Sequence, residues 1–308
     1  MYTIGVDLGA TYIKMGIVDT RARVYSRRKI ETPKSAKKAL LIDAIIYNIK
    51  DIIKASGKKI HRVGIGVPGP VDSQKGIVHY FPNIKGWKEV PLKAILQKRL
   101  GMAVELDNDV NAMTLGEFTF GAGRGSDNLV CITLGTGVGG GIIIGKRLYR
   151  GGSMTAGEIG HIPINEFGPK CNCAGYACLE RYVGNKYILE RAKNVFGAGI
   201  TLERLSALAR SRDKKAIAIW TDVAEKLSVA LIGVVNLLNP DKIVIGGGVS
   251  GAGSLILTPL AKQIKSRAMK DQARHVKIVL AALGPDAGII GSSLLGVAER
   301  SSAKTTVK

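Results

Sequence analysis

The sequence has few cysteines and no apolar run long enough to cross a membrane. Only 4 cysteines occur in 308 residues, and Met1 leads directly into strand-like sequence without a signal peptide. The most apolar stretch, Leu227–Leu238, is too short to span a bilayer and directly follows Glu225 and Lys226. We therefore expect a soluble protein of the reducing cytoplasm, without a membrane partner.

Acidic residues are also scarce, since 24 of them stand against 45 lysines and arginines and leave a net charge of +21. Such an excess permits weak, salt-sensitive binding to polyanions. However, the basic residues are scattered along the chain, no aromatic platform is interleaved with them, and no helix-turn-helix precedes the first strand. We expect no specific nucleic-acid partner, and a basic surface that attracts nucleotide phosphates is the better interpretation.

Most of the cysteines that do occur are gathered in one stretch, Glu158–Glu180, together with a histidine and a carboxylate at either end. The potential metal ligands are His161, Cys171, Cys173 and Cys178. Three thiolates and one imidazole complete a tetrahedral set for zinc and leave no position for water, so a zinc ion here would be structural. It would fix the directions of Glu158 and Glu180. A disulfide pair or ordinary buried cysteines are the alternatives.

The N-terminal sequence predicts a tight β-hairpin with a small-residue tip. Residues 3–8 and 13–18 are apolar and β-branched, and Gly9 and Thr11 lie in the tip between them. Glycine lets backbone N–H groups approach an anion, to which Thr11 adds a hydroxyl and Lys14 a charge. Asp7, at the end of the first strand, can reach a magnesium ion.

The same pattern returns at residues 129–145, where an apolar strand ends in Leu134-Gly135, a glycine and threonine tip follows, and an apolar strand returns. One phosphate-binding hairpin used once in each half of the chain is the favoured interpretation. Two unrelated hairpins are the alternative. Further along, the strand 242–245 ends in Gly246-Gly247-Gly248, which is a pattern of nucleotide contact before a helix.

A third cluster of polar residues, Asp107-Asn108-Asp109, follows the short strand 104–106. Ligands of α/β sheets bind in loops just past the ends of strands. We select Asp109 as a general base, and Asn108 can donate to and accept from a hydroxylic substrate. Capping of the following helix by one of the three residues is the alternative.

The remaining periodicity predicts an α/β protein, and the length of 308 residues suits two modest domains. Helices are expected at residues 37–54, 91–100, 111–119, 181–196, 202–210, 214–238 and 288–299, and further strands at 63–67 and 276–281.

With these motifs placed, the chain resembles the ROK family of sugar kinases, within the actin-like ATPase superfamily. The matching segments are Asp7–Lys14, Gly66–Asp72, Pro82–Trp87, Asn108–Ala112, Leu134–Gly141, Glu158–His161, Cys171–Glu180 and Gly246–Val249. The E-x-G-H and three-cysteine motifs are the most specific to the family, whereas the hairpin glycines are shared by the superfamily. Ala174 and Ala177 depart from the family by replacing glycines that are usual between the cysteines.

The resemblance implies two RNase H-like lobes with an interlobe cleft, in which sugar lies deep and ATP bridges both lobes. The N-terminal lobe would span 1–110, completed by the C-terminal helix 289–301. The C-terminal lobe would span 111–288 and carry the zinc loop 158–180. A homodimer is expected from the resemblance alone.

The resemblance also implies roles for individual residues. Sugar would be bound by Gly69, Asn83, Asn108, Asp109, Glu158, His161 and Glu180, with Asp109 as the base. The phosphates would be surrounded by Gly9, Thr11, Gly135, Thr136 and Gly137, and the adenosine by Gly247 and Gly248. Zinc would be held by His161, Cys171, Cys173 and Cys178, with the second ring nitrogen of His161 left for sugar.

The implied activity is transfer of phosphate from ATP, with Mg²⁺, to a hexose hydroxyl. Glucose is the first choice, because paired Glu158 and His161 suit two neighbouring hydroxyls, and the product would be glucose 6-phosphate. A kinase for N-acetylmannosamine, N-acetylglucosamine or another hexose is the alternative. A sugar-sensing regulator would need a DNA-binding segment, for which we find no room before Asp7, and an actin-like ATPase would have no use for Glu180 beside a metal.

Overall fold

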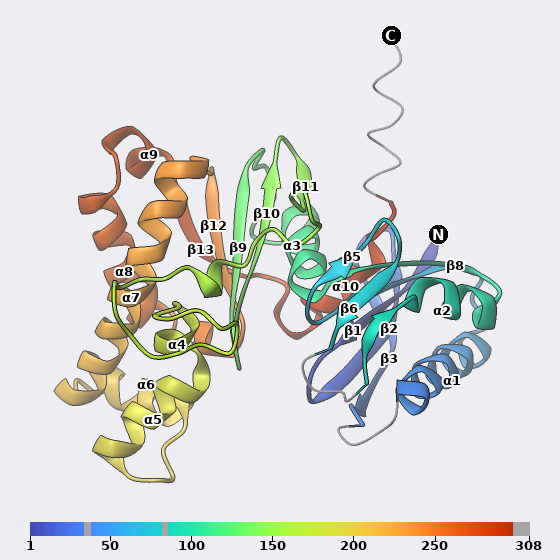
Figure 1. The fold of residues 1–308 in the computed structure, drawn as a ribbon, viewed down its shortest axis with the longest axis horizontal. Helices are drawn as coiled ribbons and strands as arrows, with labels where there is room; N and C mark the ends of the chain where they lie inside the picture. Colours follow the sequence, from blue (N-terminus) through green and yellow to red (C-terminus); the bar gives the residue numbers. More distant parts are fainter. Residues whose placement is uncertain (34–37, 82–85, 298–308) are drawn as a thin grey trace. The chain divides into compact units, whose positions relative to one another are not determined.

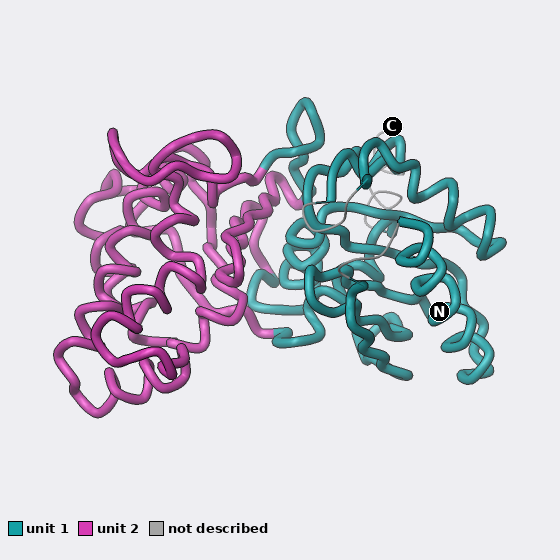
Figure 2. The backbone as a smooth tube through the Cα atoms, turned by 60° about the horizontal axis from the view of Figure 1, so that its bottom comes forward, with its two compact units in different colours: residues 1–124, 147–156, 283–308 teal, residues 125–146, 157–282 magenta. Residues whose placement is uncertain are grey.

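A computed structural model describes residues 1–33, 38–81 and 86–297 of the chain. The chain divides into two compact units, which Figure 2 distinguishes by colour. Unit 1 comprises residues 1–124, 147–156 and 283–308, and unit 2 comprises residues 125–146 and 157–282. The lobe boundaries expected from the sequence stay a prediction. Within the described residues, no helix combines the length and the apolar character needed to cross a lipid bilayer.

Unit 1 is built on a five-stranded sheet with the order β3-β2-β1-β4-β8 (Figure 1). Its strands are β1 (Tyr2–Leu8), β2 (Tyr12–Asp19), β3 (Val24–Glu31), β4 (Ile60–Val67) and β8 (Ala103–Asn108). The first three strands pair antiparallel, whereas β4 is parallel to both β1 and β8. The N-terminal hairpin is therefore present as predicted.

One face of this sheet packs on two helices, α1 (Lys38–Ser56) and α2 (Leu92–Leu100). Alternate residues of β1 supply the contact, because Ile4, Val6 and Leu8 are fully buried while their neighbours point to the other face. The α2 helix ends as predicted, with Gly101 in the left-handed conformation just past its last residue.

The opposite face of the sheet is covered by α10 (Ala287–Ser293), which also packs on α3 (Asp109–Phe120). Close approach requires glycine in the strands. A Cβ atom on Gly5 would lie 1.9 Å from the carbonyl oxygen of Ile289, and one on Gly64 would lie 1.8 Å from that of Ser292. The helix ends at Ser293 and residues 294–297 form turns, so the predicted helix 288–299 is shorter than expected.

A small antiparallel sheet in unit 1 comprises β5 (Val71–Asp72), β6 (Ile77–Tyr80) and β7 (Lys88–Val90). Its anchor is a pair of buried rings, Phe81 and Trp87, with centroids 5.4 Å apart. These strands are too short for a readable alternation of apolar and polar residues, and the sequence did not predict them.

The second five-stranded sheet has the order β11-β10-β9-β12-β13. Its strands β9 (Leu129–Leu134), β10 (Val138–Ile144), β12 (Lys242–Gly246) and β13 (Lys277–Leu280) belong to unit 2, and β11 (Arg147–Tyr149) belongs to unit 1. β9 pairs antiparallel with β10 and parallel with β12, which is parallel to β13. This repeats the arrangement of the first sheet, which supports one hairpin design used twice.

The long helix α7 (Lys214–Leu238) forms the centre of the core of unit 2 and buries Trp220, Leu227 and Leu231. It ends as predicted, with Asn239 in the left-handed conformation. The other helical segments of the unit are η1 (Ile159–His161), α4 (Glu180–Val183), α5 (Asn185–Phe196), α6 (Leu202–Arg210), η2 (Gly248–Ala252), α8 (Ser254–Arg267) and α9 (Lys270–His275). The predicted helix 181–196 is wrong as one helix, because the extended backbone of Gly184 separates α4 from α5.

Candidate active site and metal centre

The tip of the β1–β2 hairpin is fixed by backbone contacts and by one buried threonine. The Gly9 N–H donates to the Tyr12 carbonyl at 3.0 Å, and the Thr32 N–H donates to the Thr11 carbonyl at 2.9 Å. The Thr32 hydroxyl, on a residue only 4% exposed, donates to the Gly9 carbonyl at 2.7 Å. Sequence reasoning missed Thr32, since a lone threonine after a strand carries no signal of such a contact.

A carboxylate and an ammonium group lie opposite one another behind this tip. Asp7 and Lys14 are paired across the strands, and their Oδ2 and Nζ atoms are 3.5 Å apart. Burial raises the pKa of the Asp7 carboxyl, while the charge of Lys14 acts in the opposite direction. Lys29 faces Lys14 from the next strand, which adds positive charge to the row. Such a row can hold a phosphate together with its counter-cation.

The Asp107-Asn108-Asp109 cluster resolves the question of which residue caps the helix. Asn108 is the N-cap of α3, because its Oδ1 accepts from the backbone N–H of Val110 at 2.9 Å and of Asn111 at 3.2 Å. Its Nδ2 donates to the Gly69 carbonyl at 3.1 Å. Asp109 is the first helical residue, two residues earlier than predicted. A capping role therefore falls to Asn108, and Asp109 stays our candidate for the base.

An ion pair that was not foreseen from the sequence joins the first residue of this cluster, Asp107, to Arg150. Asp107 is 1% exposed, and its Oδ2 accepts from the Arg150 Nε at 2.7 Å. Its Oδ1 accepts from the Asn108 backbone N–H at 2.7 Å and from the Asn111 side chain at 2.9 Å. The pair ties the residues around Asp109 to a distant segment of the same unit. Arg150 stands 43 positions away from Asp107, so no local pattern could have revealed it.

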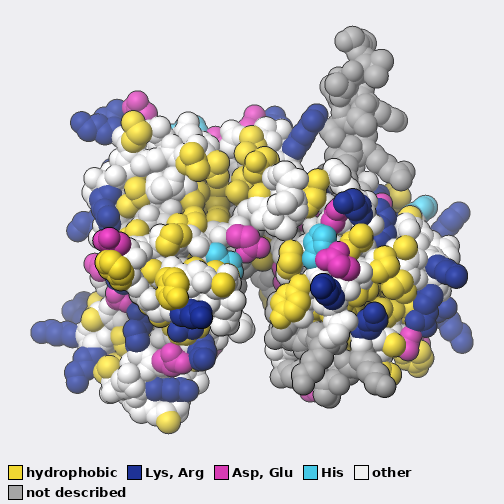
Figure 3. All heavy atoms as spheres, viewed as in Figure 1, with side chains coloured by type: hydrophobic (Ala, Val, Ile, Leu, Met, Phe, Trp, Pro, Cys, Tyr) yellow, Lys and Arg dark blue, Asp and Glu magenta, His cyan; other side chains and the backbone are white. Residues whose placement is uncertain are grey.

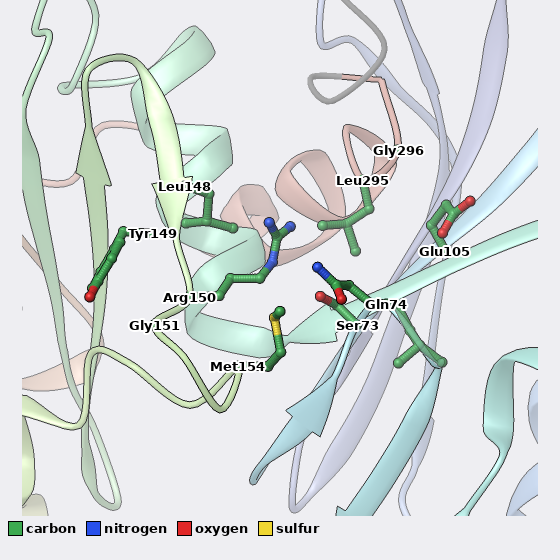
Figure 4. Close-up of a pocket in the computed structure, with 11 residues that line it drawn as sticks. Ser73, Gln74, Glu105, Leu148, Tyr149, Arg150, Gly151, Met154, Leu295 and Gly296 are labelled. Carbon is green, nitrogen blue, oxygen red and sulfur yellow. The ribbon is translucent and has the colours of Figure 1, made fainter. Parts of the chain in front are cut away.

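Arg150 also borders a cavity of about 340 Å³ in unit 1. Figure 4 shows its guanidinium between Leu148 and Gln74, with Met154 and Leu295 nearby. None of the residues that line the cavity belongs to the predicted site. The cavity is thus connected to the Asp107 network and does not include Asp109 itself.

The β9–β10 hairpin of unit 2 has a glycine-rich tip of the same length, residues 135–137. The Gly135 N–H donates to the Gly137 carbonyl at 2.9 Å, and the Asn185 N–H donates to the Gly135 carbonyl at 2.8 Å. The Val138 N–H donates to the Glu180 Oε2 at 2.9 Å. A Cβ atom on Gly137 would lie only 2.5 Å from that same oxygen. The tip therefore needs glycine where the Glu180 carboxylate lies against it.

The glycines after β12 lie beside this tip. A Cβ atom on Gly247 would lie 2.3 Å from the carbonyl oxygen of Leu134, the last residue of β9. Gly247 has a φ of 85° and precedes η2, which begins at Gly248. Two of the predicted nucleotide-contacting segments thus meet within unit 2.

The four predicted metal ligands converge, with their ligand atoms all within 4.8 Å of one another. The Sγ atoms of Cys173 and Cys178 are 3.6 Å apart, and the Cys171 Sγ lies 3.6 Å from the His161 Nδ1. Zn–S bonds of ~2.3 Å in a tetrahedron place two sulfur atoms about 3.8 Å apart, whereas a disulfide needs ~2.05 Å. The cluster therefore fits a zinc site, and a bond between Cys173 and Cys178 is excluded.

The chemistry of the ligands agrees with this geometry. Burial raises the pKa of the Cys178 thiol to about 12, and a backbone hydrogen bond from Gly175 lowers that of Cys173. A zinc ion supplies the positive charge that a buried thiolate needs. The His161 Nδ1 faces the cluster, while its Nε2 lies 3.8 Å from the Glu158 Oε2. The two ring nitrogens thus have different neighbours, and the predicted division of His161 between zinc and sugar stays a prediction.

Among the other predicted site residues, Asn83 lies outside the described part of the chain. Unit 1 carries Asp7, Gly9, Thr11, Lys14, Gly69, Asn108 and Asp109, whereas unit 2 carries Gly135, Thr136, Gly137, Glu158, His161, Glu180, Gly247 and Gly248. Their roles stay predictions. On the face drawn in Figure 3, lysine and arginine side chains are spread over both units and are not gathered in one patch.

Comparison with known proteins identifies the group to which this fold and these motifs belong. The profile of the ROK family matches residues 3–299. The chain belongs to the ROK family. Among ROK relatives, a glucokinase of Streptomyces coelicolor is 36% identical over 309 residues, which cover 94% of this chain and 96% of that protein. A xylose repressor of Caldicellulosiruptor bescii is 32% identical and covers 94% of this chain, which spans 76% of the repressor.

Solved ROK structures confirm the predicted fold class. The crystal structure of a ROK family glucokinase from Streptomyces griseus, in complex with glucose and AMPPNP, superimposes with a TM-score of 0.83 at 36% identity. The match covers 95% of this chain and 98% of that one. The chain is therefore an α/β protein of the actin-like ATPase fold, with a cysteine and histidine cluster that fits structural zinc.

Proposed function

We propose that this chain is an ATP-dependent hexose kinase that converts glucose to glucose 6-phosphate. The observation that carries the proposal is its 36% identity, over nearly its whole length, to a glucokinase whose structure contains glucose and AMPPNP. Members of one fold family can act on different substrates, because the substrate is selected by the residues of the site and not by the fold. N-acetylmannosamine, N-acetylglucosamine or another hexose is the alternative substrate.

In the proposed mechanism a sugar hydroxyl attacks the γ-phosphate of ATP in line with the leaving oxygen. Asp109 accepts the hydroxyl proton as the new oxygen–phosphorus bond forms. The hydrogen bonds of Asp107 with Arg150 and with the Asn108 backbone hold the start of α3. Asp109 is therefore fixed in position before the substrates bind. The Oδ1 of Asn108 accepts the two capping hydrogen bonds and one hydrogen of its Nδ2 is donated to Gly69, which leaves the second Nδ2 hydrogen for the sugar.

The donor phosphates are held by the two hairpin tips, each through backbone N–H groups. In unit 1, Lys14 adds a positive charge, and Asp7 would hold Mg²⁺ through water, where the ion neutralises the phosphate charge. In unit 2, Gly135, Thr136 and Gly137 contribute the second tip, with Gly247 and Gly248 for the adenosine. Zinc, held by His161, Cys171, Cys173 and Cys178, would orient the neighbouring sugar ligands.

Sugar hydroxyls are read by carboxylates and by one imidazole nitrogen. Glu158 and the His161 Nε2 are neighbours 3.8 Å apart, which suits two adjacent hydroxyls. Glu180, Gly69 and Asn83 complete the set. Glu158 keeps 56% of its side chain exposed, so it remains available to a ligand.

A panel of hexoses in a coupled ADP-release assay tests this function. We expect ADP release that depends on sugar, with the highest kcat/KM for glucose. ADP release at the same rate without sugar would contradict the kinase and indicate an actin-like ATPase. A higher kcat/KM for an N-acetylhexosamine would keep the chemistry and change the substrate.

A sugar-sensing regulator is the second candidate, because the xylose repressor is 32% identical over 94% of this chain. The same experiment separates the two. Sugar binding by calorimetry without any ADP release would favour the regulator. A DNA-binding assay with the same protein then checks our expectation that it has no specific nucleic-acid partner.

We also propose that the protein works as a homodimer in the cytoplasm. Light scattering after size-exclusion chromatography measures the mass directly, and a mass near 32.7 kDa would contradict the dimer. Fractionation of the source cells checks the compartment.

A further inference from the structure

One carboxylate, that of Glu180, lies between the metal loop and the second phosphate hairpin. It begins α4, two residues after the metal ligand Cys178. Its Oε2 accepts from the backbone N–H of Val138, the first residue of β10, at 2.9 Å. The bond spans 42 positions of sequence, so the contact depends on the tertiary fold of unit 2.

A second segment of the metal loop lies close to the carbonyl group of the same residue, Val138. A Cβ atom on Gly160, in η1 beside the ligand His161, would lie 2.0 Å from the Val138 carbonyl oxygen. The N–H of Val138 therefore meets α4, and its C=O meets η1. The four-ligand cluster joins these two segments, since His161 belongs to η1 and Cys178 leads into α4.

The tip itself leaves little room for another arrangement. Gly137 packs against the Glu180 carboxylate, and the backbone N–H of Asn185, just past α4, donates to the Gly135 carbonyl at 2.8 Å. A hydrogen bond to an ionised acceptor is among the stronger contacts available to a backbone N–H. Glu180 thus supplies the charged member of a short set of contacts that orient the tip.

We propose that Glu180 is a positioning residue for the phosphoryl donor, in addition to the sugar contact assigned to it under the proposed function. Its Oε2 orients the Gly135–Gly137 tip, and its Oε1 accepts a sugar hydroxyl. Because the same carboxylate then serves both substrates, a bound sugar hydroxyl holds Glu180 in the orientation in which its Oε2 contacts the tip that receives the donor phosphates. Hexose and nucleotide therefore bind with positive coupling through Glu180.

Two substitutions of Glu180 distinguish the role of its Oε1 toward the sugar from the role of its Oε2 toward the tip. Glu180→Gln keeps a carbonyl oxygen for the Val138 N–H but presents an amide to the sugar, whereas Glu180→Ala removes both contacts. Glu158→Gln is the matched control, because Glu158 lies beside His161 and has no bond to the tip among the described residues. Zinc content, measured for every variant, shows whether the loop is intact.

The measurement is the Kd of AMPPNP with Mg²⁺, by calorimetry, with and without saturating glucose. For Glu180→Ala we expect AMPPNP binding without sugar to weaken about 5- to 20-fold, within the usual range of coupling between sites. Glu180→Gln and Glu158→Gln should bind AMPPNP like the wild type, yet show a raised KM for glucose. Glucose should tighten AMPPNP binding in the wild type and leave Glu180→Ala unchanged.

Equal AMPPNP affinities in the wild type, Glu180→Ala and Glu180→Gln, all with bound zinc, would overturn this inference. Hydrogen exchange of the Val138 amide gives a readout that needs neither substrate. We expect faster exchange in zinc-loaded Glu180→Ala and wild-type protection in Glu180→Gln, and an unchanged rate in both would also overturn it. Failure of the proposed function looks different, because the wild type itself would then release no ADP in response to any hexose.

Discussion

The two glycine-tipped hairpins share their strand pairing but are secured by different chemistry. In unit 1 the β1–β2 tip is closed by backbone contacts and the Thr32 hydroxyl, with Asp7 and Lys14 paired behind it. In unit 2 the β9–β10 tip has no charged residue of its own, and its charge comes from Glu180 in the metal loop. The β1–β2 hairpin has charged residues in its own strands, whereas the β9–β10 hairpin is contacted by a charged residue from another segment.

This difference assigns distinct tasks to two similar elements. Charges within the strands of the first hairpin move only with the sheet, which suits a fixed site for a phosphate and its cation. The second tip, by contrast, is contacted by a carboxylate from the loop that carries the cysteine and histidine cluster. Duplicated topology therefore does not imply duplicated chemistry, and each hairpin is expected to fail in its own way when its support is removed.

The largest expected effect comes from a residue that belongs to neither hairpin. Asp109→Asn removes the proposed base and should lower kcat by about 10²- to 10⁴-fold, since general-base catalysis is typically of that size. Glucose binding, measured by calorimetry, should stay near that of the wild type. A variant that retains more than about a tenth of kcat would mean that the hairpins and their donors carry the catalysis without Asp109.

Metal removal should damage the second hairpin and spare the first. Cys178→Ala deletes one of four ligands, so zinc content should fall and kcat/KM should drop by about 10- to 100-fold, as for the loss of groups that orient a metal site. Elemental analysis and the ADP assay measure both. Cys131→Ala is the control, because Cys131 is buried in β9 outside the cluster and its variant should keep the zinc. Full activity in zinc-free Cys178→Ala would show that the second tip needs no support from the loop.

The charges of the first hairpin should matter for the donor alone. Lys14→Met removes the ammonium that pairs with Asp7 and should raise the KM for ATP about tenfold, with little change in the KM for glucose, because a charged hydrogen bond contributes roughly 1.5–3 kcal/mol. Lys50→Met, on the exposed face of α1, is the matched control and should behave like the wild type. An equal rise in both KM values would argue that Lys14 supports the fold of unit 1 and not the donor.

The hairpins, the metal cluster and the α/β fold could be predicted from the sequence, because a pattern of residues close together in the chain indicates each of them. The spacing of Cys171, Cys173 and Cys178 predicted that they cluster, and the structure confirms it. Supports that act across long sequence separations left no such pattern. Arg150 reaches Asp107 from another segment, and buried Glu117 accepts from the N–H of Leu283, 166 positions away.

Element boundaries failed where side chains or backbone conformation decide them. The start of α3 depends on the Asn108 side chain, which captures two backbone N–H groups and shifts the helix two residues earlier than periodicity suggested. The break at Gly184 requires an extended backbone that an apolar pattern does not register. A helix without stated bounds was expected after Gly246-Gly247-Gly248, and the structure has the short η2 there, followed by α8 from Ser254 with Pro259 inside it.

The smallest expected effect concerns strain in the loop that supports the second hairpin. Ala174 has a φ of 71° and Ala177 a φ of 54°, in the left-handed region that favours glycine, and both replace glycines of the family pattern. Ala174→Gly should therefore stabilise the zinc-loaded protein by up to about 1 kcal/mol. The substitution removes the cost of the left-handed conformation for alanine, and the greater conformational entropy of glycine in the unfolded chain offsets part of that gain. Ala218→Gly, in the exposed interior of α7, should destabilise by about 1 kcal/mol in the same urea titration. The same chemical change with opposite signs at the two sites would locate strain in the metal loop, whereas destabilisation at both would mean that the zinc ligands, and not the backbone, determine the stability of this support.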